Sequence, residues 1–294
     1  MPIRLRRSAL FMPGANARAL EKAQTLPTDA VILDLEDSVA PAAKALARKQ
    51  VCAATRARAY GNREVVVRIN ALDTPWGAED LAAACQARPD AVLVPKISCM
   101  ADVADVASRM KRLGGEGVNI WLMIETPRAV LEIGSIAQMR GHVPQLAVFI
   151  IGANDLAKET RASLSDGRAA IVPWLSQILL AARAYSLDVL DSVYNDHADL
   201  EGFRAECAQA RDLGMDGKSL IHPSQVSPCN EIFSPSAGEI TWARQISAAF
   251  ASPENAQLGV ISIDGKMVER LHLAMAERVL VVAALNDGYV KTRT

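Results

Sequence analysis

Eight short apolar runs alternate with helix-like segments along most of the chain, and this rhythm limits the possible folds more than any other feature. The runs cover residues 9–12, 30–35, 65–69, 91–94, 120–124, 146–151, 189–193 and 219–221, the last two being the weakest. Short continuous apolar runs rich in Ile and Val are typical of parallel strands covered on both faces. A strand followed by a helix, eight times over, predicts an α/β protein with a (β/α)8 TIM barrel.

Polar residues after the runs favour this barrel over a doubly wound open sheet, which is the alternative. Nearly every run is followed by such residues, namely Asn16, Glu36, Asp37, Arg68, Asn70, Lys96, Glu125, Asn154, Asp155, Asp191, Ser192 and His222. In a barrel the carboxyl ends of all strands surround one mouth, where such enzymes carry their active sites. The sequence therefore predicts a polar mouth.

The pattern changes beyond His222, where prolines 223, 228 and 235 indicate a linker. Ser236 and Glu239 then have the spacing of a capping box at a helix start. The run 260–263, an Asp-Gly pair and helical periodicity from Met267 to about Leu285 predict a turn followed by a helix. We expect a barrel over residues 1–235 and a C-terminal helical extension over 236–294, which could cover the mouth or a neighbouring subunit.

Composition narrows the partners and the compartment. With 32 Lys and Arg against 33 Asp and Glu, the net charge is −1, which does not favour nucleic acid or a membrane surface as a partner. Apolar stretches fall short of the roughly 20 residues needed to cross a bilayer. An odd number of cysteines without Cys-x-x-Cys spacing predicts reduced thiols in a cytoplasmic protein and argues against zinc: Cys52, Cys85, Cys99, Cys207 and Cys229.

Two carboxylates follow neighbouring apolar runs, Glu125 after one and Asp155 after the next. Mg²⁺ is typically held by one or two carboxylates while water and substrate oxygens complete its shell, so this pair could bind it. The alternative is that both residues begin helices. Glu125 precedes Thr126-Pro127, which reads as a cap followed by proline at the first helical position, and Asn154-Asp155 can cap as well.

The segment ILDLEDS carries more acid than a buried strand tolerates, unless its polar end faces a cation. Glu36 and Asp37 are the candidate site residues of this segment. Asp34 alternates with leucines and could instead point into the barrel and pair with Lys96 or Arg68.

Several cations are candidates for substrate binding. Arg68 could hold a carboxylate with its planar fork. Lys96 could form a Schiff base, or simply a salt bridge with the acids. Arg18 and Lys22 lie four residues apart on one helix face and could hold phosphates, or could be a solvated basic face. His222 could be a general base or a structural cap.

The motifs that carry these residues resemble the citrate lyase β-subunit-like branch of the HpcH/HpaI aldolase superfamily. The similar strings are RRSALFMPGAN, ILDLEDSVAP, VVRINALDTPWGAEDL, IET, GANDL, LDSVYNDHADLEGF, LGMDGKSLIHPSQ and LGVISIDGKMVE, in this order. The resemblance implies a (β/α)8 barrel, usually a homotrimer, that uses Mg²⁺ to cleave or form a C–C bond in β-hydroxyacyl thioesters of the malyl, citramalyl or citryl type.

The resemblance also implies roles for single residues. Glu125 and Asp155 become the Mg²⁺ ligands, and Glu36 and Asp37 orient water. The candidate substrate- and CoA-binding residues are Arg68 as carboxylate clamp, Lys96, and Arg18 with Lys22 at the carrier's phosphates. The C-terminal segment would be a lid over a neighbouring subunit, with Asp264 supplying the proton. The alternative for Asp264 is a plain hairpin turn, because Asp-Gly between apolar residues is a standard hairpin signal.

We therefore expect an enzyme, a Mg²⁺-dependent lyase that yields an acetyl thioester and a 2-oxo acid. Asp264 stands where citrate lyase β subunits often carry Asn, and this favours CoA over an acyl carrier protein as the carrier. The alternatives are a citrate lyase β subunit acting on a carrier-protein-bound citryl thioester, a non-catalytic CoA-binding protein, and a Schiff-base aldolase using Lys96.

Overall fold

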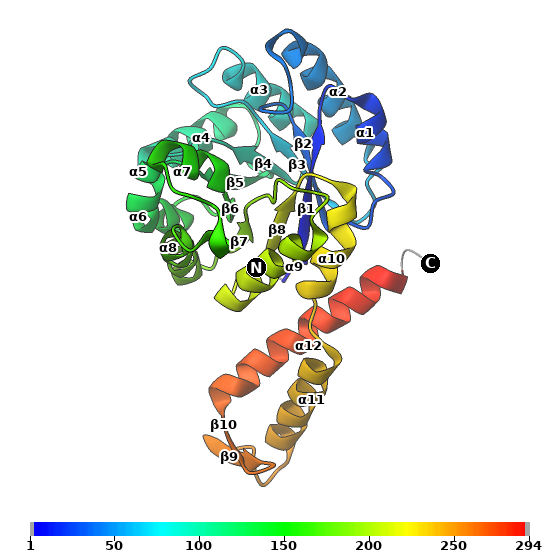
Figure 1. Cartoon of the computed structure of the whole chain (residues 1–294), viewed down its shortest axis with the longest axis vertical. Coiled ribbons are helices and arrows are strands. Elements are labelled where there is room, and N and C mark those ends of the chain that lie inside the picture. Colours follow the sequence, from blue (N-terminus) through cyan, green and yellow to red (C-terminus); the bar gives the residue numbers. More distant parts are fainter. Residues whose placement is uncertain (1–2, 292–294) are drawn as a thin grey trace. The chain divides into compact units, whose positions relative to one another are not determined.

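Eight parallel strands form a closed barrel in the computed structural model, which describes residues 3–291. Each strand pairs with the next in sequence, and β8 returns to β1 (Figure 1). The strands are β1 (Ser8–Pro13), β2 (Ala30–Asp34), β3 (Glu64–Arg68), β4 (Ala91–Val94), β5 (Asn119–Ile124), β6 (Leu146–Ile151), β7 (Asp188–Asp191) and β8 (Gly217–Leu220). The predicted (β/α)8 barrel is confirmed.

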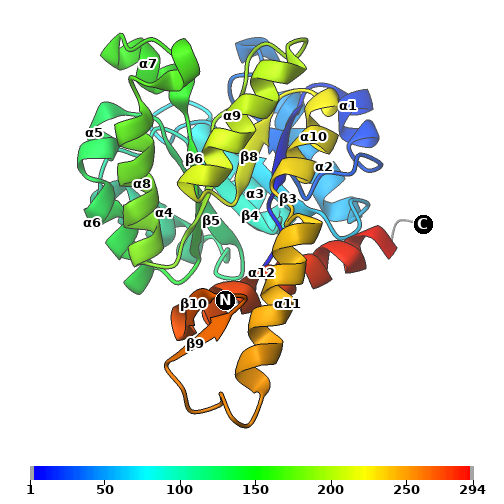
Figure 2. The ribbon, with the colours of Figure 1, turned by 60° about the horizontal axis from the view of Figure 1, so that its bottom comes forward.

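Helices follow the strands and surround the barrel, as Figure 2 also shows. They are α1 (Ala17–Lys22), α2 (Lys44–Ala57), α3 (Gly77–Ala87), α4 (Met100–Arg112), α5 (Pro127–Leu131), α6 (Ile133–Gln138), α7 (Ala153–Thr160), α8 (Val172–Ala184), α9 (Leu200–Leu213) and α10 (Val226–Ile232). Local sequence explains their starts. Asn16 caps α1 by accepting from the Ala19 N–H at 3.1 Å, and Thr126 caps α5 ahead of Pro127.

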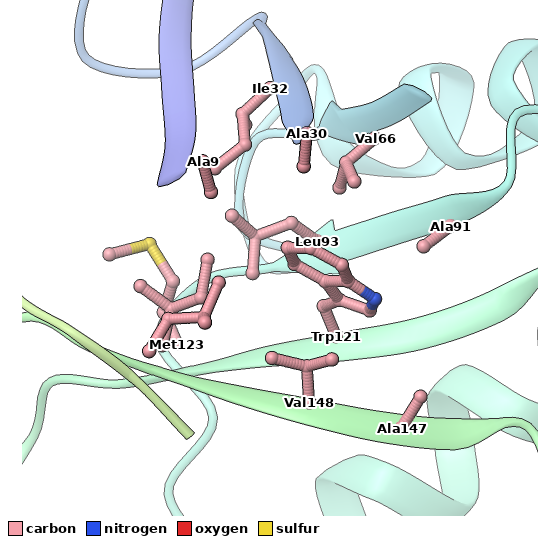
Figure 3. Packing of buried hydrophobic residues seen from close by; sticks show 12 residues of the cluster. Ala9, Ala30, Ile32, Val66, Ala91, Leu93, Trp121, Met123, Ala147 and Val148 are labelled. Atoms are coloured by element: carbon pink, nitrogen blue, oxygen red, sulfur yellow. The ribbon is translucent and has the colours of Figure 1, made fainter. Parts of the chain in front are cut away.

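Apolar side chains fill the barrel interior (Figure 3). Trp121 is fully buried there, and small residues such as Ala9, Ala30, Ala91 and Ala147 on other strands leave room for its indole. Inward-pointing residues alternate along each strand, so the interior is a packed core and not a pore. The polar strand ends are therefore the part of the barrel that is available for chemistry.

The chain divides into two compact units, and the barrel unit spans Arg6–Asn230. Within the described residues, the other unit combines residues 3–5 with residues 231–291. It contains α11 (Ala237–Ala251), β9 (Val260–Ile263), β10 (Lys266–Glu269) and α12 (Arg270–Lys291). Its small core consists of Ala243, Ile246, Phe250, Val268 and Ala276. The first two and last three residues of the predicted ranges 1–235 and 236–294 lie outside the described residues.

The predicted capping box at Ser236 is confirmed, since its hydroxyl accepts from the Glu239 N–H at 3.2 Å and the Glu239 carboxylate accepts from the Ser236 N–H at 2.7 Å. The predicted helix from Met267 is wrong at its start. Residues 266–269 form a strand, and the helix begins at Arg270. Asp264 and Gly265 have φ values of +50° and +75°, as a two-residue type I′ turn requires, so the chain folds back as a hairpin.

No helix in the described part of the chain combines the length and the apolar character that crossing a bilayer requires. All five cysteines are free thiols.

Candidate active site

Asp34 ends β2 and forms a bidentate ion pair with Arg68, which ends β3. Its two oxygens accept from Arg68 Nε and Nη2, both at 2.7 Å. Burial would raise the pKa of Asp34, but the guanidinium and a hydrogen bond from the Ser38 hydroxyl lower it below its usual range. Asp34 is 1% exposed. The predicted pairing of Asp34 with Arg68 is confirmed, and Asp34 has a structural role.

Arg68 has one nitrogen that Asp34 does not use. This Nη1 lies 2.8 Å from Glu36 Oε2 and 3.1 Å from Asp37 Oδ2. The guanidinium carbon also lies 4.7 Å from the centre of the Phe11 ring. Asp34 occupies the Nε and Nη2 edge, so a substrate carboxylate would have to use the other edge, formed by Nη1 and the second N–H of Nη2. Because Glu36 and Asp37 already lie close to Nη1, the carboxylate clamp stays a prediction.

Glu36 carries a buried oxygen without a hydrogen bond. Its side chain is 12% exposed, and Oε2 has no hydrogen-bond partner because the nearby Arg68 Nη1 does not have hydrogen-bond geometry. Burial raises the pKa of Glu36 to about 8, since the lowering effect of Arg68 is opposed by Asp37, Glu125 and Asp34. A carboxyl group in this state can still donate or accept a proton at the mouth.

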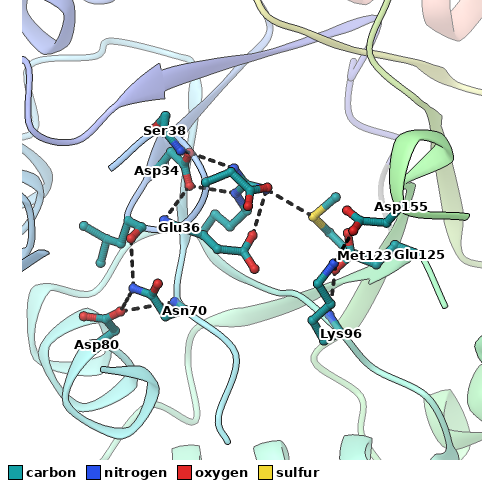
Figure 4. A network of polar contacts seen from close by, with 12 residues as sticks. Asp34, Glu36, Ser38, Asn70, Asp80, Lys96, Met123, Glu125 and Asp155 are labelled. Carbon is teal, nitrogen blue, oxygen red and sulfur yellow. Dashed lines mark hydrogen bonds and ion pairs between the residues drawn. The ribbon is translucent and has the colours of Figure 1, made fainter. Parts of the chain in front are cut away.

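Glu125 and Asp155 converge on the ammonium of Lys96 (Figure 4). Lys96 Nζ lies 2.8 Å from Asp155 Oδ1 and 3.4 Å from Glu125 Oε1, and the Lys96 backbone N–H donates to the same Glu125 oxygen at 2.8 Å. The salt-bridge alternative for Lys96 is therefore confirmed. Neither carboxylate is a helix cap, because Thr126 caps α5 and Gly152 precedes α7. The predicted helix starts are nevertheless confirmed, because the Thr126-Pro127 pair next to Glu125 caps and opens α5, and Asp155 lies in the first turn of α7.

Gly152 makes room for the Glu125 side chain, a function that sequence reasoning missed. A Cβ atom on Gly152 would lie 2.4 Å from Glu125 Cβ and 2.9 Å from its Oε2. A glycine directly after the apolar run 146–151 is a signal of close approach and could have identified it.

The donor set fits a hard divalent cation. Two carboxylates share one positive charge, and the mouth contains further acids at Glu36 and Asp37. Among residues 3–291 no group of three or more His, Cys, Asp or Glu side chains could hold a metal. A site with two protein carboxylates suits Mg²⁺, which retains water and substrate oxygens, better than an ion that needs a complete protein cage.

A cavity of about 440 Å³ opens beside Lys96. Its lining includes Pro95, Ile97, Ser98 and Arg128. Neither Glu125 nor Asp155 lines this cavity, so it adjoins the two carboxylates only through Lys96.

Arg18 and Lys22 are exposed on α1, at the β1 side of the mouth. His222 lies two residues after the end of β8, and its ring stacks on the ring of His197 with centroids 4.4 Å apart. His222 accepts from the Ser224 N–H and caps the following turn, so the structural cap is confirmed. Asp264 lies exposed at the tip of the β9–β10 turn, in the other unit.

A (β/α)8 barrel with charged side chains gathered at the carboxyl ends of its strands is the architecture of barrel enzymes, which carry their active sites at these strand ends. Residues 7–223 match the family model of HpcH/HpaI aldolase/citrate lyase, and the chain belongs to this family. It is an enzyme of the aldolase and lyase type. The predicted resemblance is confirmed.

Named relatives cover nearly the whole chain. It is 45% identical over 277 residues to a (3S)-malyl-CoA thioesterase of Cereibacter sphaeroides, covering 94% of each chain. It is 35% identical over 289 residues to citrate lyase subunit beta of Escherichia coli K12, covering 96% of this chain and 95% of the relative. The structure of CitE from Mycobacterium tuberculosis with magnesium, acetoacetate and coenzyme A has a TM-score of 0.77 at 31% identity, covering 94% of this chain and 97% of that one.

Proposed function

We propose that this chain is a Mg²⁺-dependent lyase that cleaves or forms a C–C bond in a β-hydroxyacyl-CoA of the malyl, citramalyl or citryl type. The products of cleavage are an acetyl thioester and a 2-oxo acid. The observation that carries the proposal is that Glu125 and Asp155 converge on the Lys96 ammonium, across the mouth from Arg68 with Glu36 and Asp37. The magnesium and coenzyme A in the CitE structure support it.

Glu125 and Asp155 would hold the metal ion. When bound, Mg²⁺ polarises the hydroxyl and carboxylate oxygens of a substrate. The Lys96 ammonium neutralises the charge of the same two carboxylates. Once a divalent ion neutralises them instead, the ammonium becomes available to an anionic substrate. This gives Lys96 a substrate-binding role without a Schiff base.

The remaining residues serve the proton and charge movements of cleavage. The substrate hydroxyl would pass its proton to water held at the mouth, and its oxygen would become the carbonyl of the 2-oxo acid as the C–C bond breaks. The electron pair of that bond forms the enolate of the acetyl thioester, which must then be protonated. Arg68 Nη1 would bind a substrate carboxylate, while Glu36 and Asp37 orient water. Asp264 of a neighbouring subunit would deliver the proton to the enolate.

The carrier and the assembly belong to the same proposal. Arg18 and Lys22 would hold phosphates of CoA, as their exposed position at the mouth permits. Residues 236–294 would act as a lid on a neighbouring subunit of a cytoplasmic homotrimer. Apolar side chains on the hairpin and α12 support a protein partner, since Met267, Leu271 and Met275 are 68%, 54% and 63% exposed.

Thioester hydrolysis is the second candidate, because the relative with 45% identity is named a malyl-CoA thioesterase. In that reaction water attacks the thioester carbonyl and the CoA thiol leaves, while the C–C bond stays intact. The same anionic acyl group would occupy the same mouth. A carrier-protein thioester remains the alternative substrate for the lyase.

The test supplies malyl-, citramalyl- and citryl-CoA to the purified protein with Mg²⁺ and measures two products separately. A lyase releases a 2-oxo acid without free thiol, and a thioesterase releases thiol without a 2-oxo acid. EDTA and Asp155→Asn should each abolish activity, and Asp155→Asn should lose Mg²⁺ binding in calorimetry. Turnover that resists EDTA, or trapping of Lys96 by borohydride, would overturn the proposal, as would the absence of both products.

A further inference from the structure

Lys44, at the start of α2, is a buried lysine for which the proposed reaction has no role. It is 6% exposed, and its ammonium lies under the loop that follows β2. Nζ donates to the backbone oxygens of Leu35 and Glu36 at 2.8 and 2.7 Å, and to Asn70 Oδ1 at 2.7 Å. An ammonium has three N–H donors, and each has an acceptor here. The ring of Trp76 lies 5.3 Å from Nζ.

These contacts fix the backbone on both sides of Glu36. The Leu35 N–H donates to the Arg68 backbone oxygen at 2.9 Å, and the Glu36 N–H donates to Asp34 Oδ1 at 2.9 Å. Lys44 holds the two oxygens of the same stretch. The backbone N–H and C=O groups of both Leu35 and Glu36 are therefore hydrogen-bonded, which restrains the backbone that carries the Glu36 carboxyl group.

Asn70 connects this arrangement to α3. Its Nδ2 donates to the Leu35 oxygen at 2.8 Å and to Asp80 Oδ2 at 2.5 Å, while its Oδ1 accepts from Lys44. Figure 4 shows Asn70 between Asp80 and the loop that carries Glu36. The loop is thus supported from two helices, α2 through Lys44 and α3 through Asp80.

Packing alone does not require a charge in this place. Burying a lysine costs free energy, and an apolar side chain of similar volume is often neutral or stabilising at buried charged positions. A neutral amine would offer only two donors to three acceptors. All three N–H donors of the Lys44 ammonium have acceptors, and two of these are backbone oxygens. This points to a positioning role, because the hydrogen bonds define where the two backbone oxygens lie.

We propose that Lys44 is a positioning residue that holds the Leu35–Glu36 backbone so that Glu36 Oε2 lies at the mouth across from Glu125 and Asp155. Lys44 does not touch the substrate. Its effect on turnover rests on the proposed function, in which Glu36 orients water at the reacting atoms. Its effect on the loop does not rest on that function.

The test compares Lys44→Met with Lys218→Met. Lys218 is a fully buried lysine whose Nζ pairs with Asp191 and Glu206 at 2.6 Å, and neither partner is among the residues proposed to bind metal or substrate. We expect Lys44→Met to lower kcat at least about tenfold, because small displacements of a catalytic group are costly. KM and calorimetric Mg²⁺ affinity should change by less than about threefold. Amide hydrogen exchange at residues 35–38 should accelerate without substrate.

The control should lower stability without changing loop exchange or the kcat of the folded protein. Lys44→Cys alkylated with 2-bromoethylamine restores an ammonium of similar reach and should recover activity, whereas alkylated wild type should not gain any. Asn70→Ala removes a second donor to the Leu35 oxygen and provides the same measurements if Lys44→Met does not fold.

Unchanged loop exchange in folded Lys44→Met would overturn the proposal, and so would faster exchange with unchanged kcat. An equal loss of kcat in Lys218→Met would also overturn it, because the effect would then be one of general stability. If wild type lacks lyase activity, the proposed function fails, while the exchange measurement still decides whether Lys44 holds the loop.

Discussion

Asp34 and Glu36, which are separated by a single residue, have pKa values shifted in opposite directions. Burial acts on both, but Asp34 receives two guanidinium hydrogen bonds and a hydroxyl bond, which lower its pKa. Glu36 lacks a hydrogen bond at Oε2, and burial with three acidic neighbours raises its pKa to about 8. Pairs of carboxyl groups whose environments separate their pKa values often perform different tasks at one site.

The raised pKa of Glu36 predicts a pH-dependent stability. Without metal, the folded state retains a proton that the unfolded state releases between pH 4.5, the ordinary value, and about 8. Stability contributed by this group is therefore present at low pH and lost as pH rises through that window. In EDTA, the Tm of Glu36→Gln relative to wild type should increase from pH 5 to pH 8 and then level off. Exposed Glu159→Gln is the control, and a constant difference for Glu36→Gln would contradict the prediction.

Arg68→Lys should lower kcat/KM at least about tenfold, or about 1.4 kcal/mol, because lysine keeps the charge but cannot serve Asp34 and a substrate together. Asp34→Asn is the matched control, since it weakens the ion pair and leaves Nη1 in place. Steady-state kinetics and Tm would be measured for both. If Asp34→Asn reproduces the whole kinetic loss, Arg68 acts only through Asp34, and the substrate contact is absent.

At the scale of elements, the sequence predicts strands well where neutral side chains are buried on both faces. The first six runs match β1 to β6 within one or two residues. The apolar pattern is weak at β7 and β8 because these strands carry buried charged side chains. Lys218 is fully buried and pairs with Asp191 across the two strands, and such pairing is invisible in a local pattern.

The site was predictable in part for the same reason. Acids after apolar runs identify Glu36, Glu125 and Asp155 as candidates, since polar residues at strand ends share one mouth. The partners that define their chemistry come from distant segments. No local pattern marks Lys44 as part of the site, and only the fold brings its ammonium to acceptors that follow β2 and β3.

Gly152 provides a prediction about the junction between β6 and α7. Gly152→Ala should displace Glu125, because its Cβ would lie 2.4 Å from Glu125 Cβ. We expect a loss of Mg²⁺ affinity of about 10- to 100-fold, the usual effect of disturbing the support of a metal ligand. Gly134→Ala is the control, because nothing lies within 4 Å of a Cβ there and alanine favours its helix. Calorimetric titration showing equal affinity for both variants would remove Gly152 from the site.

At the scale of the whole molecule, the proposed lid predicts that active sites combine two chains. Asp264→Asn and Glu125→Gln should each be inactive alone, and mixing them under conditions of subunit exchange should restore activity. In a cyclic assembly with one site per interface, an equal mixture should regain about one quarter of the sites, since each needs an intact Glu125 from one chain and an intact Asp264 from the next.

Asparagine is the right replacement for Asp264, because it tolerates the left-handed backbone of the turn. Subunit exchange must be verified by mass measurement of mixed oligomers. Activity that stays absent in verified mixed oligomers, or full activity of Asp264→Asn alone, would leave Asp264 as a turn residue.

The left-handed backbone at Asp264, with φ of +50°, also limits how this position can change in evolution. Most side chains are strained there, and the residues that fit easily are glycine, asparagine and aspartate. Of these three, only aspartate can release a proton. A single exchange of oxygen for nitrogen at the tip of the hairpin can therefore remove an acid and leave the shape intact, so descendants of one ancestor can differ in chemistry while their folds stay superimposable.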